Sequence, residues 1–273
     1  MLFRSAQRLG EPGRQQEWLE KAKQQDARNE AATLMLEAEM YNEERRFAEA
    51  LAALQRLQGK QGRHIAALRL ELRARQGLGD WDGVLKLLRQ LAKRDALAPE
   101  LVNALPSKAH LANLARCGSD RAALVAYLRK LPEAERSLKV VLAAVRGLAA
   151  AGADADAQKL IEEQLEGNDD EAWQSELPAI YGSLAGGDQL SRIARGEAWL
   201  RQRPAHAGLL LALGRMCARQ RLWGKAQSFL EASLAVEDTQ AGHLELARLD
   251  DQLERVDDAN RHYRAAVAPN TLK

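Results

Sequence analysis

The chain has 273 residues, with 40 lysines and arginines against 38 acidic residues and a formal net charge of +2. This balance lacks the cationic excess of duplex-binding domains and disfavours a nucleic-acid partner. Cys117 and Cys217 form neither a disulfide framework nor a clustered zinc motif. No window approaches the roughly 18 apolar residues of a membrane span, and Met1-Leu2-Phe3-Arg4 is not a signal peptide, so we expect a soluble chain.

The composition favours helices. Apolar residues make up 46% of the chain, aromatic residues only 4%, and there are seven prolines. The apolar fraction is sufficient for a buried core, while Ala, Leu, Arg, Glu and Gln dominate and runs of Val, Ile and Thr are scarce. A single core of this size would be unusually large, which suggests internal repetition.

A repeat of about 34 residues extends along the chain. The predicted units begin near residues 31, 65, 104, 138, 173, 207 and 240, after a truncated first unit at 1–30. Each unit is expected to contain two helices joined by a tight turn, which often requires positive φ, where glycine costs least. Position 15 of the unit falls in this turn and is glycine in five of eight units, namely Gly10, Gly79, Gly118, Gly152 and Gly187.

Two further positions define the contact between the paired helices. Position 20, early in the second helix, is alanine in most units so that the first helix can approach closely: Ala50, Ala123, Ala157, Ala226 and Ala259, with Gln15, Val84 and Arg192 as exceptions. Position 24 lies one turn further along the same face and is apolar except at Gly196. Its other residues are Leu19, Leu54, Leu88, Tyr127, Ile161, Leu230 and Tyr263.

The spacing of the units is least regular in two places. One interval is 39 residues long, with the five extra residues near 98–103 and with Pro99 and Pro106 beside them. This arrangement predicts an irregular connection or a lengthened helix. The least regular units are expected at roughly 99–131 and 171–204.

These features resemble the tetratricopeptide family across essentially the whole chain. The resemblance implies an all-α fold: a single right-handed superhelical solenoid of about eight helix pairs over residues 1–273, with first helices lining a concave surface. Met1 falls at position 6 of the first unit. Because a terminal unit normally needs a complete polar cap, we expect a fragment of a longer protein; the alternative is a short native first helix.

One segment is more specific than the repeat. Leu213-Gly214-Arg215-Met216-Cys217 is followed by Leu222-Trp223-Gly224-Lys225-Ala226 and by Phe229-Leu230-Glu231-Ala232-Ser233-Leu234. Supporting pieces are Gly79-Asp80-Trp81, Glu197-Ala198-Trp199-Leu200 and Leu244-Glu245-Leu246-Ala247-Arg248. Together they resemble the HemY family, membrane-anchored tetratricopeptide proteins encoded with haem-biosynthesis enzymes in proteobacteria.

The HemY resemblance implies a non-catalytic scaffold or regulator of late protohaem synthesis at the bacterial inner membrane, with late haem-biosynthesis enzymes as protein partners. It also implies an N-terminal membrane anchor, missing here, and repeats facing the cytoplasm. Two alternatives stay open: a haem or porphyrin carrier, and a peptide-binding module from another pathway. No phosphate loop, nucleophile elbow or two-histidine metal helix occurs, so neither enzyme activity nor a metal is predicted.

The predicted binding face is basic. Positions 5, 9 and 13 of the first helices lie about one turn apart and carry Arg69, Arg73, Arg146, Arg215, Arg219 and Arg248. Guanidinium groups bind carboxylates bidentately, so this stripe suits an acidic partner segment or the propionates of a porphyrin. Glu39, Glu43 and Asp251 share the face and interrupt it; a solvated charged face is the alternative.

Two smaller predictions concern histidines and Gly224. An axial haem ligand needs an imidazole in a shielded apolar slot, and His64 and His206 are the candidates; the alternative is a solvated residue at a helix start. Gly224 costs roughly 0.5 to 1 kcal/mol relative to alanine within a helix. Either a partner packs against Gly224 while Lys225 binds its acidic group, or Gly224 lets Trp223 staple the turn, which we favour.

Overall fold

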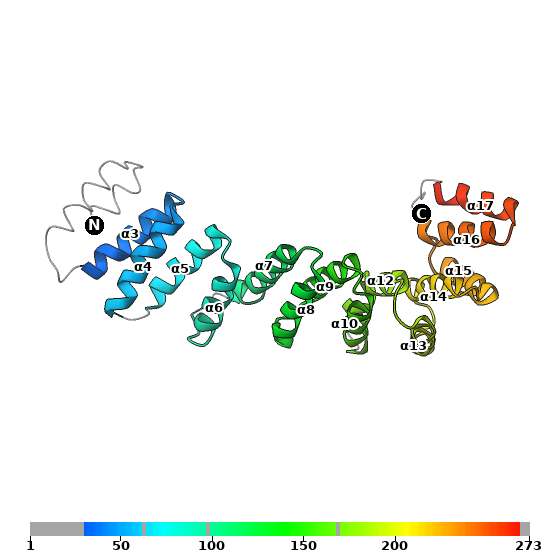
Figure 1. The fold of residues 1–273 in the computed structure, drawn as a ribbon, viewed down its shortest axis with the longest axis horizontal. Helices are drawn as coiled ribbons and strands as arrows, with labels where there is room; N and C mark the ends of the chain where they lie inside the picture. Colours follow the sequence, from blue (N-terminus) through cyan, green and yellow to red (C-terminus); the bar gives the residue numbers. More distant parts are fainter. Residues whose placement is uncertain (1–29, 62–63, 97–98, 168–169, 268–273) are drawn as a thin grey trace. The chain divides into compact units, whose positions relative to one another are not determined.

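The computed structural model describes residues 30–61, 64–96, 99–167 and 170–267. These residues form fifteen α-helices and no strand, which confirms the predicted all-α class (Figure 1). Contacts divide the chain into two compact units, with the division between Asn113 and Leu114, inside one helix. The truncated unit predicted at 1–30 lies almost entirely outside the described residues.

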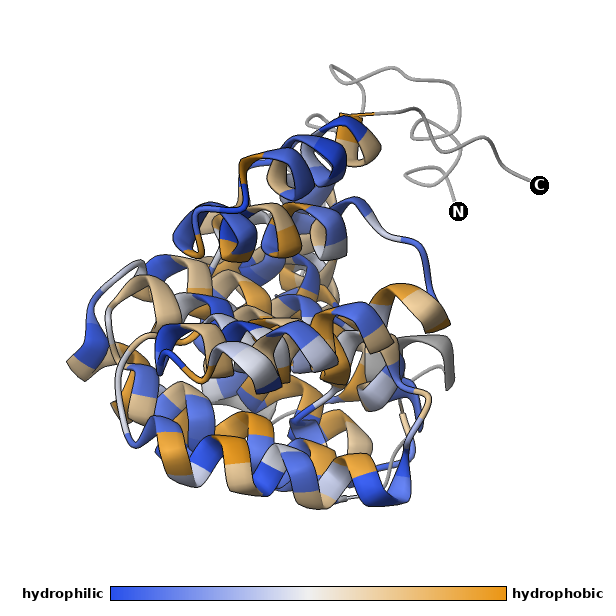
Figure 2. Cartoon of the chain, turned by 90° about the vertical axis from the view of Figure 1, so that its right-hand side faces the viewer, coloured by the Kyte–Doolittle hydropathy of each residue, from blue (hydrophilic) through white to orange (hydrophobic). Residues whose placement is uncertain are grey.

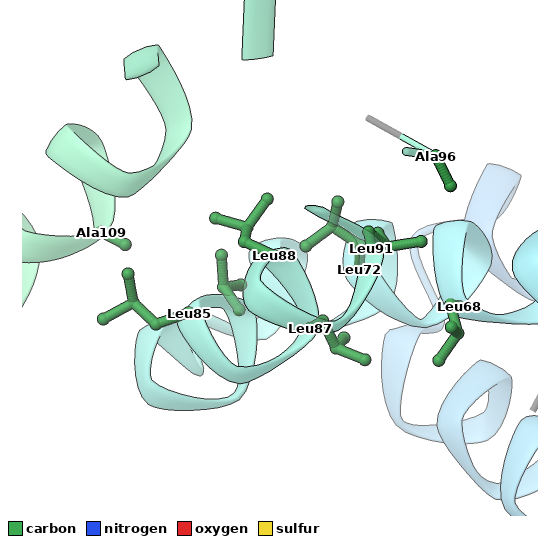
Figure 3. Close-up of a cluster of buried hydrophobic side chains, with 9 residues drawn as sticks. Leu68, Leu72, Leu85, Leu87, Leu88, Leu91, Ala96 and Ala109 are labelled. Atoms are coloured by element: carbon green, nitrogen blue, oxygen red, sulfur yellow. The ribbon is translucent and has the colours of Figure 1, made fainter. Parts of the chain in front are cut away.

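The first compact unit contains α3 (Glu30–Glu43), α4 (Phe47–Gln61), α5 (Ile65–Leu78), α6 (Trp81–Ala92) and most of α7 (Pro99–Cys117). Helices α3 to α6 each pack against the next, and α5 also contacts α3. Leucines of α5 and α6 form a buried cluster with Ala109 of α7 (Figure 3). Since each buried leucine contributes about 1.5 to 3 kcal/mol, this cluster is a main source of stability here.

The second compact unit begins with the end of α7 and continues as a series of short helices. They are α8 (Arg121–Lys130), a 3-10 turn at Glu133–Glu135, α9 (Leu138–Ala150), α10 (Asp154–Glu166), α11 (Asp170–Gln174), α12 (Leu177–Ser183), α13 (Gln189–Gln202), α14 (Ala207–Arg219), α15 (Trp223–Val236), α16 (Gln240–Gln252) and α17 (Val256–Val267). The most extensive contacts join α14 to α15 and α16 to α17, while α12 packs on α14. Hydrophobic and hydrophilic residues lie on the same helices, as expected where each helix buries one face (Figure 2).

The predicted turn position, position 15 of the repeat, has a positive φ in the structure. Gly79, Gly118, Gly152 and Gly187 have φ values of 70°, 56°, 66° and 80°, as predicted for position 15. In the three other described units the same position is occupied by Arg45, Arg221 and Glu254, with φ of 59°, 57° and 59°. A non-glycine residue pays roughly 1 to 2 kcal/mol for this conformation. All seven described turns therefore adopt one backbone geometry, whichever residue is present.

Position 20 is buried in most described units. Ala50, Val84, Ala157, Ala226 and Ala259 are at most 1% exposed, and Ala123 is half-buried. Small side chains at this position therefore do lie where the paired helices approach each other. Arg192 is also 0% exposed, although it is far larger than alanine.

The two irregular stretches are also found. Of the stretch near 98–103, residues 99–103 belong to α7, which is 19 residues long and contains Pro106, so the structure shows the lengthened helix; residues 97–98 lie outside the described residues. In the stretch 171–204, two short helices, α11 and α12, stand in place of one first helix.

None of the helices in the described ranges combines the length and apolar character required to cross a bilayer.

Candidate partner-binding site

Two of the predicted binding arginines lie on α5. Arg69 is exposed, and its Nη2 donates a hydrogen bond to the carbonyl of Ala96, 2.8 Å away and just beyond α6. Arg73, one turn later, is exposed and makes no hydrogen bond or ion pair within the described part of the chain. Arg69 thus secures the turn after α6, whereas the side chain of Arg73 is accessible.

In the second compact unit, three of the predicted arginines pair with carboxylates. Arg146 of α9 pairs with Glu176, which precedes α12. Arg215 of α14 and Arg248 of α16 both pair with Glu245 of α16, at 2.9 and 3.1 Å. Besides Glu39, Glu43 and Asp251, which were predicted to interrupt the stripe, two further carboxylates therefore pair with its arginines. Glu176 and Glu245 were missed, although each follows its arginine by 30 positions, close to the repeat length.

Arg219 differs because it has no carboxylate partner among the described residues. Its Nη1 and Nη2 atoms donate to the carbonyls of Leu184 and Ser183, at 2.9 and 3.0 Å, where α12 ends. Arg192 of α13 approaches the same segment, and its Nη1 donates to Leu184 at 2.9 Å while its Nη2 donates to the carbonyl of Gly186. Two guanidinium groups therefore converge on one stretch of backbone carbonyls.

The irregular unit explains why Arg192 replaces the alanine of position 20. Helix α12 has only 7 residues, so the backbone after it leaves the helix early and its carbonyls lack helical partners. The buried side chain of Arg192 supplies donors to these carbonyls. Gly196, the exception at position 24, is needed for a related reason, because a Cβ there would lie 2.8 Å from Cδ2 of Leu213 on α14.

Three side-chain donors share the carbonyl oxygen of Leu184. Its carbonyl accepts from Arg192, from Arg219 and from Nε2 of Gln189, the last at 3.2 Å. A carbonyl oxygen has two lone pairs, so three donors exceed its capacity. Meanwhile Nε of Arg192 and Oε1 of Gln189 are buried without a partner. The crowding is confined to the Leu184 carbonyl, because the neighbouring carbonyls of Ser183, Ala185 and Gly186 each accept one of the other donors.

Three guanidinium groups also lie near one another here, those of Arg192, Arg215 and Arg219. Although Arg219 as a whole is exposed, partial burial of its guanidinium group against the end of α12 lowers its pKa, and the charges of Arg192 and Arg215 lower it further. Burial likewise lowers the pKa of Arg192. The acids that act on these arginines already have other donors. Asp154 accepts from the amide of Gly186, and Glu245 is shared by Arg215 and Arg248. Glu162 accepts from Tyr181, and Asp188 accepts from the amide of Ser191. We refer to Arg192, Arg215 and Arg219 as the arginine cluster.

The Leu222–Ala226 segment lies at the start of α15. Leu222 is 38% exposed, Trp223 is half-buried and Ala226 is buried. A Cβ on Gly224 would meet no atom within 4 Å, its two chain neighbours aside. Lys225 is not free, because its Nζ lies 2.9 Å from Oε1 of Glu197. No packing from outside the segment therefore requires glycine at this position.

The histidine candidates offer no free imidazole in a shielded slot. His206 caps α14, with Nδ1 accepting from the amide of Leu209 at 3.0 Å, so its proton is assigned to Nε2, which lies 2.8 Å from the carbonyl oxygen of Trp173. Both nitrogens are thus engaged, and iron ligation would break the cap. His64 is exposed at the start of α5. The haem-carrier alternative gains no support from this geometry.

The cysteines and acidic residues do not form a metal site in the described structure. Cys217 is fully buried, and burial raises the pKa of its thiol to about 11, so it remains protonated near neutral pH. Within the described ranges, no group of three or more His, Cys, Asp or Glu side chains could hold a metal ion.

A concavity apart from the arginine cluster lies between α10, α11 and α13. It has a volume of about 710 Å³, and Trp173, Trp199, Arg195 and Arg203 are among its lining residues. Both arginines are neutralised, Arg195 by Glu166 and Arg203 by Asp170. The indoles are 3% and 7% exposed, so they offer little surface to a ligand. The arginine cluster is therefore the stronger candidate site.

No protein-family model matches this chain, and no curated protein sequence matches it significantly.

Proposed function

We propose that this chain is a tetratricopeptide solenoid of about eight helix pairs that acts as a non-catalytic docking scaffold. Its partners are protein segments rich in Asp and Glu. The resemblance of the Leu222–Ala226 segment to the HemY family points to the late enzymes of protohaem synthesis at the bacterial inner membrane, with the repeats facing the cytoplasm.

The recurring turn supports the solenoid part of this proposal. Positive φ at position 15 of every described unit, together with the buried position 20, indicates that successive helix pairs share one local geometry. Units of this kind bury their apolar faces by stacking on their neighbours, which leaves an extended surface for partners. Binding on such a surface needs no reaction centre.

The arginine cluster is the single observation that supports acidic partners. Arg219 is an exposed residue with two donors directed to backbone carbonyls and no carboxylate to balance its charge in the described structure. A carboxylate adds the attraction of a full negative charge to the charge-assisted hydrogen bonds that Arg219 already donates, and it can accept two of them in parallel. An acidic segment would therefore be preferred over the present acceptors.

The partner assignment can be tested by crosslinking in cells. The chain is expressed behind the two membrane helices that the HemY family carries, and the proteins crosslinked to it are identified by mass spectrometry. We expect enrichment of at least one late haem-biosynthesis enzyme over the same anchor fused to an unrelated helical-repeat domain. Equal recovery of all these enzymes with both fusions would reject the haem assignment.

A further inference from the structure

We propose that Arg219 is the anchor of a carboxylate subsite, in which an Asp or Glu side chain of the partner replaces the carbonyls of Ser183 and Leu184 as the acceptor of its two Nη donors. The inference rests on the proposed docking function and names the residue that provides it. The present carbonyls then occupy the positions of the missing carboxylate oxygens, at 2.9 and 3.0 Å from the guanidinium nitrogens.

The hydrogen-bond balance makes this exchange inexpensive. When Arg219 turns away, Leu184 keeps two donors, Arg192 and Gln189, which matches its two lone pairs. Ser183 is exposed, so water can bind its carbonyl in place of the guanidinium group. Neither acceptor is left buried and unsatisfied, and the usual penalty for breaking such bonds is avoided.

The charges favour the same exchange. The positive charges of Arg192 and Arg215 act on Arg219, and the acids nearby, Asp154 and Glu245, are held by other donors. A carboxylate at Arg219 would relieve the repulsion among these guanidinium groups. It would also form two parallel N–H···O bonds, since the planar guanidinium fork matches the geometry of a carboxylate.

The orientation of Arg219 explains why the subsite would select an anion over a neutral group. Arg219 already binds two neutral carbonyl oxygens, so a neutral ligand would gain little by replacing them. Only an acceptor with a full negative charge offers a stronger bond than the one that is lost. A phosphate group shares this chemistry, and the experiment below separates the two.

The subsite can be tested with labelled hexaglutamate and the purified 273-residue chain, using fluorescence anisotropy at low ionic strength. We expect Arg219→Gln to weaken binding by about ten-fold or more, because a hydrogen-bonded charge pair is lost. Arg219→Lys should be intermediate, since a lysine retains the charge without the fork. The matched control is Arg121→Gln, an exposed arginine on α8 that is paired with Asp156 and should leave binding unchanged.

A second measurement does not depend on how well the variants fold. In wild-type protein, the Nε–Hε signal of Arg219 is followed by NMR during titration with hexaglutamate and, separately, with inorganic phosphate. We expect hexaglutamate to shift this signal. A shift with phosphate alone would overturn the acidic-segment subsite, and so would the absence of hexaglutamate binding by the wild type.

The two proposals fail in distinguishable ways. If hexaglutamate binds with equal affinity to wild type and Arg219→Gln, and the Arg219 signal does not move, the subsite is wrong while docking elsewhere on the chain stands. If the subsite behaves as expected but no late haem enzyme is enriched in the crosslinking experiment, the subsite is supported and the haem assignment is rejected.

Discussion

The guanidinium group of Arg192 is fully buried and hydrogen-bonded only to backbone carbonyls. A buried charge is tolerated near the negative end of a helix, and carbonyls at and after the C-terminus of α12 accept from its Nη1 and Nη2, while its Nε has no partner. The residue that breaks the alanine pattern therefore stabilises the unit in which the first helix is broken.

Replacing Arg192 by alanine should lower the free energy of unfolding by about 2 to 4 kcal/mol, because several carbonyls lose their donors and a cavity remains. Chemical denaturation followed by circular dichroism measures this loss. Arg195→Ala on the same helix is the control: this side chain is 42% exposed, and its loss should cost no more than about 1 kcal/mol. Equal effects of the two substitutions would show that Arg192 is not a structural residue.

Two glycines should respond in opposite ways to substitution by alanine. Gly224 has open space around it, so Gly224→Ala should raise the free energy of unfolding by about 0.5 to 1 kcal/mol through helix propensity. In α12, a Cβ on Gly182 would overlap Cα of Ala212 on α14, so Gly182→Ala should lower it by about 1 to 3 kcal/mol. Both values follow from denaturation midpoints. A destabilising Gly224→Ala would instead support the interpretation that Gly224 lets Trp223 staple the turn.

At the scale of the element, α16 and α17 are joined by a pair of imidazoles. Nδ1 of His243 and Nδ1 of His262 lie 2.9 Å apart, and Nε2 of His243 lies 2.8 Å from Oδ1 of Asp238. Because the carboxylate accepts from Nε2, Nδ1 of His243 is assigned as the acceptor and His262 as the donor. The pair keeps this bond only while His243 is neutral.

This pair should make α17 less stable in acid. Burial and the neighbouring His243 lower the pKa of His262 below its ordinary value of 6.5, so the unfolded state takes up the proton first. Stability is then highest above about pH 6.5 and falls as pH drops towards the lowered pKa. Hydrogen exchange of residues 240–267, corrected for intrinsic rates, should show weaker protection at pH 5.5 than at pH 7.5.

The control for the pH effect is His262→Asn, which should remove the difference in protection, with exposed His64→Asn leaving it unchanged. A carboxylate in the same helix pair acts in the opposite direction, because burial raises the pKa of Asp250 above 3.8. The comparison with His262→Asn isolates the histidine from this effect. Equal pH dependence in wild type and His262→Asn would contradict the prediction.

At the scale of the whole molecule, the proposed solenoid would be held together by contacts between neighbouring units. Removing a core side chain should therefore destabilise mainly the helices near it. Leu148 on α9 is 1% exposed, and Leu148→Ala should cost the second compact unit about 2 to 5 kcal/mol. Hydrogen exchange should report lost protection in α9 and α10, with residues 30–92 almost unaffected. A uniform loss across both units would indicate a single cooperative core in place of a nearest-neighbour array.

Much of the helical organisation could be predicted from the sequence because it depends on local rules. The turn at Gly79 and its equivalents follows from backbone sterics, and the alanines of position 20 follow from helix periodicity. Arg45 and Glu254 adopt the same positive φ, although backbone sterics alone would favour glycine there. The candidate site was harder to predict, because Arg219 looked identical to its neighbours on the predicted stripe.

The sequence by itself determined that the chain is helical, where its turns fall and where the repeat is disturbed, since propensity and periodicity are properties of neighbouring residues. Tertiary structure alone decided which arginines are neutralised. Arg215 meets Glu245 and Arg219 meets the carbonyls after α12 only because residues about 30 positions apart lie side by side. Charge balance at a surface depends on such distant partners, and no local pattern encodes them.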